Sequence, residues 1–399
     1  MDSAKMVKLA DISELITKGT TPTTFGYEFQ EDGVKFLKIE CFNEQGGFIP
    51  DKVTYISEEC NEKLKRSQIK ENDILFSIAG AIGRVAIATR EMIPANTNQA
   101  LAIIRIREGE AYIPYLKLIL TSKIVRDQFE KQKQGVAQLN LSLKNIGDLE
   151  VPICSLEKQK KFVDLFSKIQ DAIDNRKQEL EQLDILIKAR FVEMFGDPEI
   201  NSKNLPVIPM TETCEIIDGD RGKNYPTQDD FLDEGYCLFL NAKNVTTNGF
   251  SFENCMFVTK EKDEILRKGH LNRGDIVLTT RGTIGNLAFY DDSVPFENVR
   301  INSGMVILRM NHDIVTEYFF IEQFKMQLAS IKERIASGSA QPQLPISIMN
   351  KIMVLMPDVR QQEQFADFVK QVDKSKLAVQ KSLEKTQQLF DSLMQKYFG

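Results

Sequence analysis

The chain has 399 residues, which is enough for two to four domains, and 42% of them are hydrophobic, as in a globular protein with packed cores. The net charge is −6, and no segment carries a marked basic excess, which disfavours a protein that binds nucleic acid tightly by itself. No apolar run approaches the ~20 residues of a membrane span. Six scattered cysteines, two histidines and the lack of a signal peptide disfavour a zinc site and predict a cytoplasmic protein with reduced thiols.

The chain contains the same pattern twice. The pattern Asp-Ile-[Leu/Val]-[Phe/Leu]-[Ser/Thr]-x-x-Gly-x-Ile-Gly occupies residues 73–83 and returns at residues 275–285. Other segments also recur, namely 7–19 at 207–219, 33–39 at 235–241, and 101–106 at 305–310. The spacing between the copies drifts by a few residues in polar loops, where insertions are tolerated. We therefore interpret the chain as a tandem duplication.

Each copy begins with a strand-rich domain and ends in a long helix. The predicted domains are residues 1–153 and 207–356, in which short β-branched and aromatic runs end at glycine turns. Each also holds one helical segment, at 112–132 and at 314–335. The predicted long helices lie within residues 154–196 and 357–399, and residues 197–206 form a linker.

The two long helices carry an apolar heptad seam. In the helix expected over residues 156–195, apolar residues recur at steps of four and three, and every position of the copy at 359–398 is the first number plus 203. Two equal seams in one chain predict that the helices pair, and a pseudo-two-fold relation requires them to run antiparallel. The predicted fold class is α+β: two similar mixed α/β domains, a pseudo-two-fold tandem repeat, joined by two long helices in an antiparallel coiled coil.

The chain lacks the motifs of the common catalytic sites. It has no phosphate-binding loop, no Gly-x-Ser-x-Gly elbow, no His-Glu-x-x-His pair and no histidine in its first half. Gly80–Gly83 and Gly282–Gly285 lie between strand-like runs, which is typical of tight turns. The polar residues at matched positions are Lys, Arg, Asn, Gln, Ser and Thr, which read bases and phosphates. We therefore predict no catalytic and no metal-binding residues.

The order and double occurrence of these motifs resemble the specificity subunit of a type I restriction–modification system. The resemblance depends on the repeated pattern at 73–83 and 275–285 and on the glycine–glutamine elements at 135–138 and 338–341. It also depends on the start of each helix, where Pro357 and Gln362 fit the family, while the first copy keeps Gln159 but has Cys154 in place of proline.

The resemblance implies that the chain recognises DNA and has no enzymatic activity of its own. Each domain would read one half of a bipartite double-stranded target, and the coiled coil would set the spacing and dock two modification subunits. No cofactor is implied in this chain. S-adenosylmethionine would belong to the methylase partner, which flips and methylates an adenine, and ATP would belong to the restriction and motor subunits.

Candidate base-reading residues are polar side chains in loops at equivalent places of the two copies. Arg, Asn and Gln weigh most, because they make bidentate contacts to guanine and adenine. We expect Asn96, Asn98 and Gln99 to match Asn298, Arg300 and Asn302. The predicted DNA-binding residues are Lys18, Thr20, Thr21, Lys38, Asn43, Arg84, Asn96, Asn98, Gln99, Gln138, Arg221, Lys223, Asn224, Asn241, Lys243, Asn244, Arg281, Asn298, Arg300, Asn302 and Gln341.

Other functions stay open at this point. A fused methylase–nuclease would need a cofactor loop and an Asn/Asp-Pro-Pro-aromatic motif, and the sequence has neither. A scaffold that joins two protein-binding β domains through the coiled coil is the second alternative. The third is the specificity subunit of a related methylase-only or variant restriction system.

Overall fold

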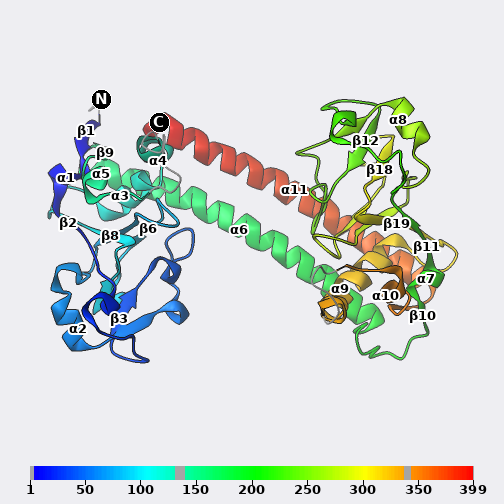
Figure 1. Ribbon diagram of the computed structural model, residues 1–399, viewed down its shortest axis with the longest axis horizontal. Coiled ribbons are helices and arrows are strands. Elements are labelled where there is room, and N and C mark those ends of the chain that lie inside the picture. Colours follow the sequence, from blue (N-terminus) through cyan, green and yellow to red (C-terminus); the bar gives the residue numbers. More distant parts are fainter. Residues whose placement is uncertain (1–3, 131–139, 337–342, 399) are drawn as a thin grey trace. The chain divides into compact units, whose positions relative to one another are not determined.

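A computed structural model of the chain describes residues 4–130, 140–336 and 343–398. They form two compact units, one within residues 1–177 and 382–399 and the other within residues 178–381. Each unit contains one strand-rich domain and parts of both long helices (Figure 1). Within the described ranges, no helix is both long and apolar enough to cross a membrane.

The first unit is built on two small sheets. The four-stranded sheet is antiparallel throughout, in the order β2 (Ser13–Lys18), β8 (Leu101–Ile106), β5 (Ile74–Ser77) and β6 (Val85–Ile87). The other has the order β4 (Thr54–Ile56), β3 (Val34–Leu37) and β7 (Ala95–Thr97), and its strands β3 and β7 run parallel. A two-stranded ribbon pairs β1 (Lys5–Lys8) with β9 (Glu150–Ile153).

Helices cover these sheets because their apolar faces need a partner. Helix α2 (Glu58–Lys63) lies near β3 (Figure 1). Cys60 of this helix and Leu64 directly after it share an apolar cluster with Val34 and Phe36 of β3. The core of the four-stranded sheet is completed by α1 (Leu9–Ile12), α3 (Ile113–Leu120), α4 (Lys123–Glu130) and α5 (Leu143–Gly147). All four residues of β5 are buried, since one face packs on this core and the other on the three-stranded sheet.

The second unit repeats this topology. Its four-stranded sheet has the order β11 (Cys214–Asp218), β19 (Met305–Met310), β16 (Ile276–Thr279) and β17 (Leu287–Phe289). Its three-stranded sheet has the order β15 (Phe257–Val258), β12 (Cys237–Leu240) and β18 (Val299–Ile301), and β12 and β18 are parallel. The other elements are the pairs β10 (Val207–Pro209) with β20 (Met353–Leu355) and β13 (Val245–Thr246) with β14 (Gly249–Phe250), and the helices α7 (Met210–Thr213), α8 (Lys260–Ile265), α9 (Glu317–Ala336) and α10 (Ile346–Met349).

The two copies differ in their helical segments. The sequence predicts one helix over 112–132, but the structure has α3 and α4 with a break at Thr121 and Ser122. The Thr121 Oγ1 donates to the carbonyl oxygens of Lys117 and Leu118, and the Ser122 Oγ donates to that of Ile119. Such bonds compete with the helical hydrogen bonds. The second copy has Lys325 and Met326 in the matching part of α9, which is continuous.

The two long helices are α6 (Leu156–Phe195) and α11 (Val359–Phe398), each of 40 residues. In the first unit the start of α6 packs beside the end of α11, with Phe166 and Phe390 ring centroids 5.3 Å apart. In the second unit the end of α6 packs beside the start of α11, with Phe191 and Phe365 centroids 5.4 Å apart. Within each unit, therefore, the two helices pair in antiparallel orientation.

One buried glutamine fixes the first turn of each long helix to its own domain. Gln159 is fully buried; its Oε1 accepts from the Tyr112 N–H (2.8 Å) and its Nε2 donates to the Cys154 carbonyl (2.7 Å). Gln362 repeats this arrangement, with Oε1 accepting from the Thr316 N–H (2.9 Å) and Nε2 donating to the Pro357 carbonyl (3.1 Å), which matches Cys154, and also to the Ile314 carbonyl (2.9 Å). This role explains why a glutamine occurs at both helix starts, since an apolar residue there would leave backbone groups unpaired.

Candidate nucleic-acid interface

The parallel strands of the first unit bring separate loops to one edge. Leu37 at the end of β3 pairs with Thr97 at the end of β7, so the chain leaves both strands at the same edge, through Lys38 and Asn98. The loop after β2 joins them, because the Gly19 N–H donates to the Asn98 carbonyl (3.1 Å). A Cβ at Gly19 would lie 1.7 Å from the Thr97 carbonyl oxygen, so this approach requires glycine.

The loops at this edge are also tied to one another by side chains. The Thr21 Oγ1 donates to the Gln99 Oε1 (2.7 Å), and the Arg84 guanidinium donates to the Phe42 carbonyl (2.9 Å). Lys38 lies over the Phe29 ring, 4.5 Å from its centroid. We call residues 18–21, 38–43 and 98–99 the first loop cluster.

The second unit builds the same edge with different side chains. Leu240 of β12 pairs with Ile301 of β18, so Asn241 and Asn302 follow at one edge. Gly219 approaches this edge as Gly19 does, since a Cβ there would lie 2.3 Å from the Asn302 carbonyl oxygen. The Arg221 guanidinium donates to the Ser303 carbonyl (3.3 Å). We call residues 219–224, 241–244, 281 and 302–304 the second loop cluster.

Backbone donors shape the second loop cluster around one ionised carboxylate. The Gly222 N–H donates to Asp220 Oδ1 and the Arg267 N–H donates to Asp220 Oδ2, each at 2.7 Å. These hydrogen bonds hold the pKa of Asp220 below its usual range although the side chain is buried. Arg221 and Lys223 project from this loop and are exposed.

Two predicted base readers prove to be internal supports of the fold. Asn96 is fully buried; its Nδ2 donates to Asn61 Oδ1 (2.9 Å) and to the Leu64 carbonyl (3.1 Å), and its Oδ1 accepts from Ser67 Oγ (2.7 Å). Arg300 is 6% exposed; it pairs with Asp263 and donates to the Lys268 carbonyl (2.7 Å). Each residue holds the segment around α2 or α8 onto its sheet, so its burial and its internal hydrogen bonds argue against the predicted contact with bases.

Three further residues that were predicted to read bases lie at places that are unfavourable for contact with DNA. Asn244 is 1% exposed, and its Nδ2 donates to the carbonyls of Ser251 (3.0 Å) and Asn254 (2.9 Å), so its amide is used within the loop. Asn298 precedes β18 and so lies at the opposite end of that strand from the second loop cluster. Arg84 is half-buried, and its bond to Phe42 makes it a support of residues 38–43.

The structure also corrects the pairing of the two copies around β7 and β18. Asn98 Oδ1 accepts from the Ala100 N–H (3.0 Å), and Asn302 Oδ1 accepts from the Gly304 N–H (2.8 Å). Asn98 therefore matches Asn302, and the buried Asn96 matches the buried Arg300. The predicted matches were shifted along the strand, because the inserted residues lie before β18 and nothing local marks the register.

The remaining predicted residues reach the surface at least in part and stay candidates. Gln138 and Gln341 lie outside the described residues. Asn43 and Asn241 also shape their loops, since their Oδ1 atoms accept from the Gly47 N–H (2.7 Å) and the Lys243 N–H (2.9 Å). The surface candidates are Lys18, Thr20, Thr21, Lys38, Asn43, Asn98, Gln99, Arg221, Lys223, Asn224, Asn241, Lys243, Arg281 and Asn302.

Sequence reasoning missed two aromatic residues beside the first loop cluster. Phe25 is 51% exposed and follows Thr21 by one turn of 3-10 helix, and Phe29 is 37% exposed under Lys38. Exposed aromatic side chains at such an edge can stack on bases or wedge between them. The signal was the run Thr20–Phe25, in which a polar loop directly after a required glycine ends in an aromatic residue.

Two units of one topology, each with a polar loop cluster at a sheet edge, define a tandem protein with two recognition surfaces. Within the described part of the chain, no group of three or more metal-binding side chains comes together. The family model described as the type I restriction modification DNA specificity domain matches residues 1–184 and again residues 204–389. The chain therefore belongs to this family.

Relatives and solved structures agree with this assignment. The chain is 32% identical over 135 residues to the type I restriction enzyme EcoBI specificity subunit of Escherichia coli, a match that covers 33% of this chain and 28% of that relative. It is 22% identical over 404 residues to the MjaIX specificity subunit of Methanocaldococcus jannaschii, which covers 98% of this chain and 91% of that relative.

Two solved structures share the fold. A chain from a structure of the assembly and conformational transition of the type I R-M system superimposes with a TM-score of 0.60 at 15% identity, covering 100% of this chain and 98% of that one. The S subunit from M. genitalium gives 0.55 at 16% identity, with 100% and 97% covered. Together with the family match, these findings confirm the predicted fold class and the predicted role of a non-catalytic specificity subunit.

Proposed function

We propose that each loop cluster reads one half of a bipartite double-stranded DNA target. The observation that supports this most directly is that two equivalent sheet edges carry different side chains. The first offers Lys38 and the Thr21–Gln99 pair, and the second offers Arg221, Lys223 and Arg281. Arginine suits guanine, whereas asparagine and glutamine suit adenine, so two such edges read two different half-sites.

The partners follow from the same proposal. The chain would assemble with two modification subunits, which carry S-adenosylmethionine, and with restriction and motor subunits, which use ATP, and it would act in the cytoplasm without a cofactor of its own. Exposed apolar side chains on the long helices support docking there, because a partner that covers them removes apolar surface from water. These side chains are Ile185 (65% exposed), Leu186 (46%), Leu377 (56%) and Leu389 (51%).

An exchange of recognition domains tests the proposal. Replacing residues 1–153 with the equivalent domain of another specificity subunit should change one half-site of the methylated sequence and leave the other unchanged. The measurement is methylome sequencing of cells that express the hybrid chain with its methylase partner. The reciprocal hybrid at residues 207–356 is the matched control. Loss of both half-sites in either hybrid, with normal assembly, would contradict separate reading by the two loop clusters.

Arg281 provides a finer test within one loop cluster. Its side chain is exposed while its backbone N–H donates to the Gly304 carbonyl (3.2 Å), so Arg281→Ala removes the guanidinium and keeps the turn. We expect DNA binding by the complex with the methylase subunits to weaken by about 1–3 kcal/mol, roughly fivefold to 150-fold.

The control for this test is Arg90→Ala. The Arg90 side chain is 87% exposed and precedes β7, at the opposite end of that strand from the first loop cluster. Arg90→Ala should change the affinity of the complex for DNA by less than about twofold, because the lost charge is on the surface and away from the DNA. Equal losses for the two variants at the same salt concentration would indicate a general charge effect and would count against a role for Arg281 in reading.

A further inference from the structure

The seams of α6 and α11 are of equal length but not of equal chemistry. Because every α11 position is the α6 number plus 203, the two seams can be compared residue by residue. At four seam positions one helix has a polar residue where the other has an apolar one. These are Ile173 against Lys376, Arg176 against Val379, Leu183 against Thr386, and Arg190 against Leu393.

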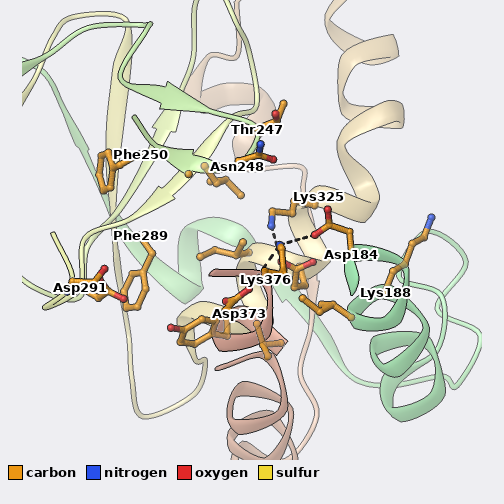
Figure 2. Close-up of a pocket in the computed structure, with 18 of the residues that line it drawn as sticks. Asp184, Lys188, Thr247, Asn248, Phe250, Phe289, Asp291, Lys325, Asp373 and Lys376 are labelled. Carbon is orange, nitrogen blue, oxygen red and sulfur yellow. Dashed lines mark hydrogen bonds and ion pairs between the residues drawn. The ribbon is translucent and has the colours of Figure 1, made fainter. Parts of the chain in front are cut away.

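Lys376 forms a charged contact between the two helices in the second unit. Its Nζ donates to Asp184 Oδ1 of α6 at 2.6 Å and lies 3.8 Å from Asp373 Oδ1 on its own helix. Figure 2 shows these side chains converging, with Lys325 of α9 beside them. They line a cavity of about 800 Å³ under the loop at Thr247 and Asn248.

The surroundings keep this contact ionic. Burial by itself lowers the pKa of Lys376, but the hydrogen bond to Asp184 and the nearby carboxylates outweigh it, and the pKa is raised. The side chain of Lys376 is 30% exposed and that of Asp184 is 60% exposed. The pair is therefore partly screened by water, and its contribution to stability is modest, although its geometry is specific.

The three matched positions of the first unit hold uncharged side chains. Ile173, which matches Lys376, is 1% exposed. The residues that match Asp184 and Asp373 are Gln387 and Gln170. A glutamine and an isoleucine can face each other at this layer, so the charges of the second unit are not needed for antiparallel pairing as such.

This difference distinguishes pairing of α6 with α11 from symmetric pairing of either helix with its counterpart in a second copy. If α6 paired with α6 of another copy in the same geometry, Asp184 would face Ile173; if α11 paired with α11, Lys376 would face Gln387. Both arrangements lose the ion pair and leave a charge at the seam, which is how a single polar seam residue selects a partner. Arg176 does not add to this selection, because its contact Ser382 matches Glu179, whose carboxylate would accept from the guanidinium more strongly than the hydroxyl does.

We propose that the Asp184–Lys376 pair directs α6 to pair with α11 and disfavours symmetric pairing of α6 with α6 or of α11 with α11 of a second copy. The layer acts as a partner-selecting contact built into the seam. The proposal does not depend on DNA recognition, so its failure would leave the proposed function standing.

The test compares three full-length chains. The double variant Asp184→Gln with Lys376→Ile, called the Gln/Ile chain, copies the layer of the first unit into the second. The double variant Asp184→Lys with Lys376→Asp, called the charge-reversed chain, exchanges the two charges and keeps the ion pair. Self-association is measured by size-exclusion chromatography with light scattering over a range of concentrations. Differently tagged copies that are unfolded and refolded together, then captured through one tag, report the exchange of helices.

We expect the natural chain and the charge-reversed chain to stay monomeric. The Gln/Ile chain should self-associate at a concentration roughly three- to tenfold lower than the natural chain would need. This is the factor expected for losing one partly exposed ion pair from each of two chains. Its midpoint of thermal unfolding should be unchanged or higher, because a well-packed apolar layer can replace an ion pair without loss. If the double variant does not fold, Lys376→Gln replaces it.

Two results would overturn the proposal. One is a Gln/Ile chain that stays monomeric over the range in which the natural chain does. The other is a charge-reversed chain that self-associates as strongly as the Gln/Ile chain, which would show that the ion pair does not select the partner.

Discussion

Replacing Arg300 with methionine is expected to lower the free energy of unfolding of the second unit by about 3–5 kcal/mol, because it leaves a buried carboxylate without its partner. Arg300 is 6% exposed and Asp263 is 7% exposed. The guanidinium also donates to the carbonyls of Lys268, Asp263 and Leu266, at 2.7, 2.9 and 3.1 Å. Denaturant unfolding followed by circular dichroism measures the loss.

Two variants separate this structural role from a role in DNA contact. Arg221→Met makes the same replacement at an arginine whose side chain is 49% exposed, and it should change stability by less than about 0.5 kcal/mol. Asp263→Leu combined with Arg300→Met removes both charges and should recover much of the lost stability. An Arg300→Met chain of normal stability whose complex no longer binds DNA would restore Arg300 as a reading residue and refute the structural assignment.

The sequence predicted the elements whose signals are periodic or repeated. The heptad seam predicted α6 and α11 over the residues that the structure shows, because apolar spacing and the stop at Gly196 are both local signals. The duplicated pattern around Gly80–Gly83 predicted two strands joined by a turn. Here Gly83 and Gly285 have φ values of 87° and 91°, a region that favours glycine.

The burial of polar residues could not be predicted in the same way. Asn96 lies between Ala95 and Thr97, and Arg300 lies between Val299 and Ile301, in strands of three residues that are too short to show which face of the strand is internal. Their partners, Leu64 directly after α2 and Asp263 in α8, lie more than 30 residues earlier in the chain. The parallel pairing of β3 with β7 is equally non-local, and it alone decides which loops share an edge. The sequence therefore predicted which loops form the candidate site. Which residues of those loops are exposed there depended on tertiary contacts.

Truncating Phe195 to alanine is expected to destabilise the second unit by about 3–5 kcal/mol, the cost of removing a buried phenylalanine from a packed core. Phe195 is fully buried, and its ring centroid lies 4.9 Å from that of Phe319 and 5.6 Å from that of Phe365. It is the last residue of α6, so the helix that begins in the first repeat completes the core of the second domain. Val192→Ala, one turn earlier at a side chain 38% exposed, is the control and should cost less than about 1 kcal/mol.

The matching residue extends this prediction to the first unit. Phe398 ends α11 and packs against Tyr115 and Phe162, with ring centroids 5.9 and 5.4 Å away. Hydrogen exchange of the amides of β5 and β16 reports each unit separately. Phe195→Ala should increase exchange in β16 first, and Phe398→Ala should increase it in β5 first. If each truncation instead loosened the unit of its own repeat, the helix ends would not complete the opposite domains, and each half of the duplication would be a self-contained folding unit.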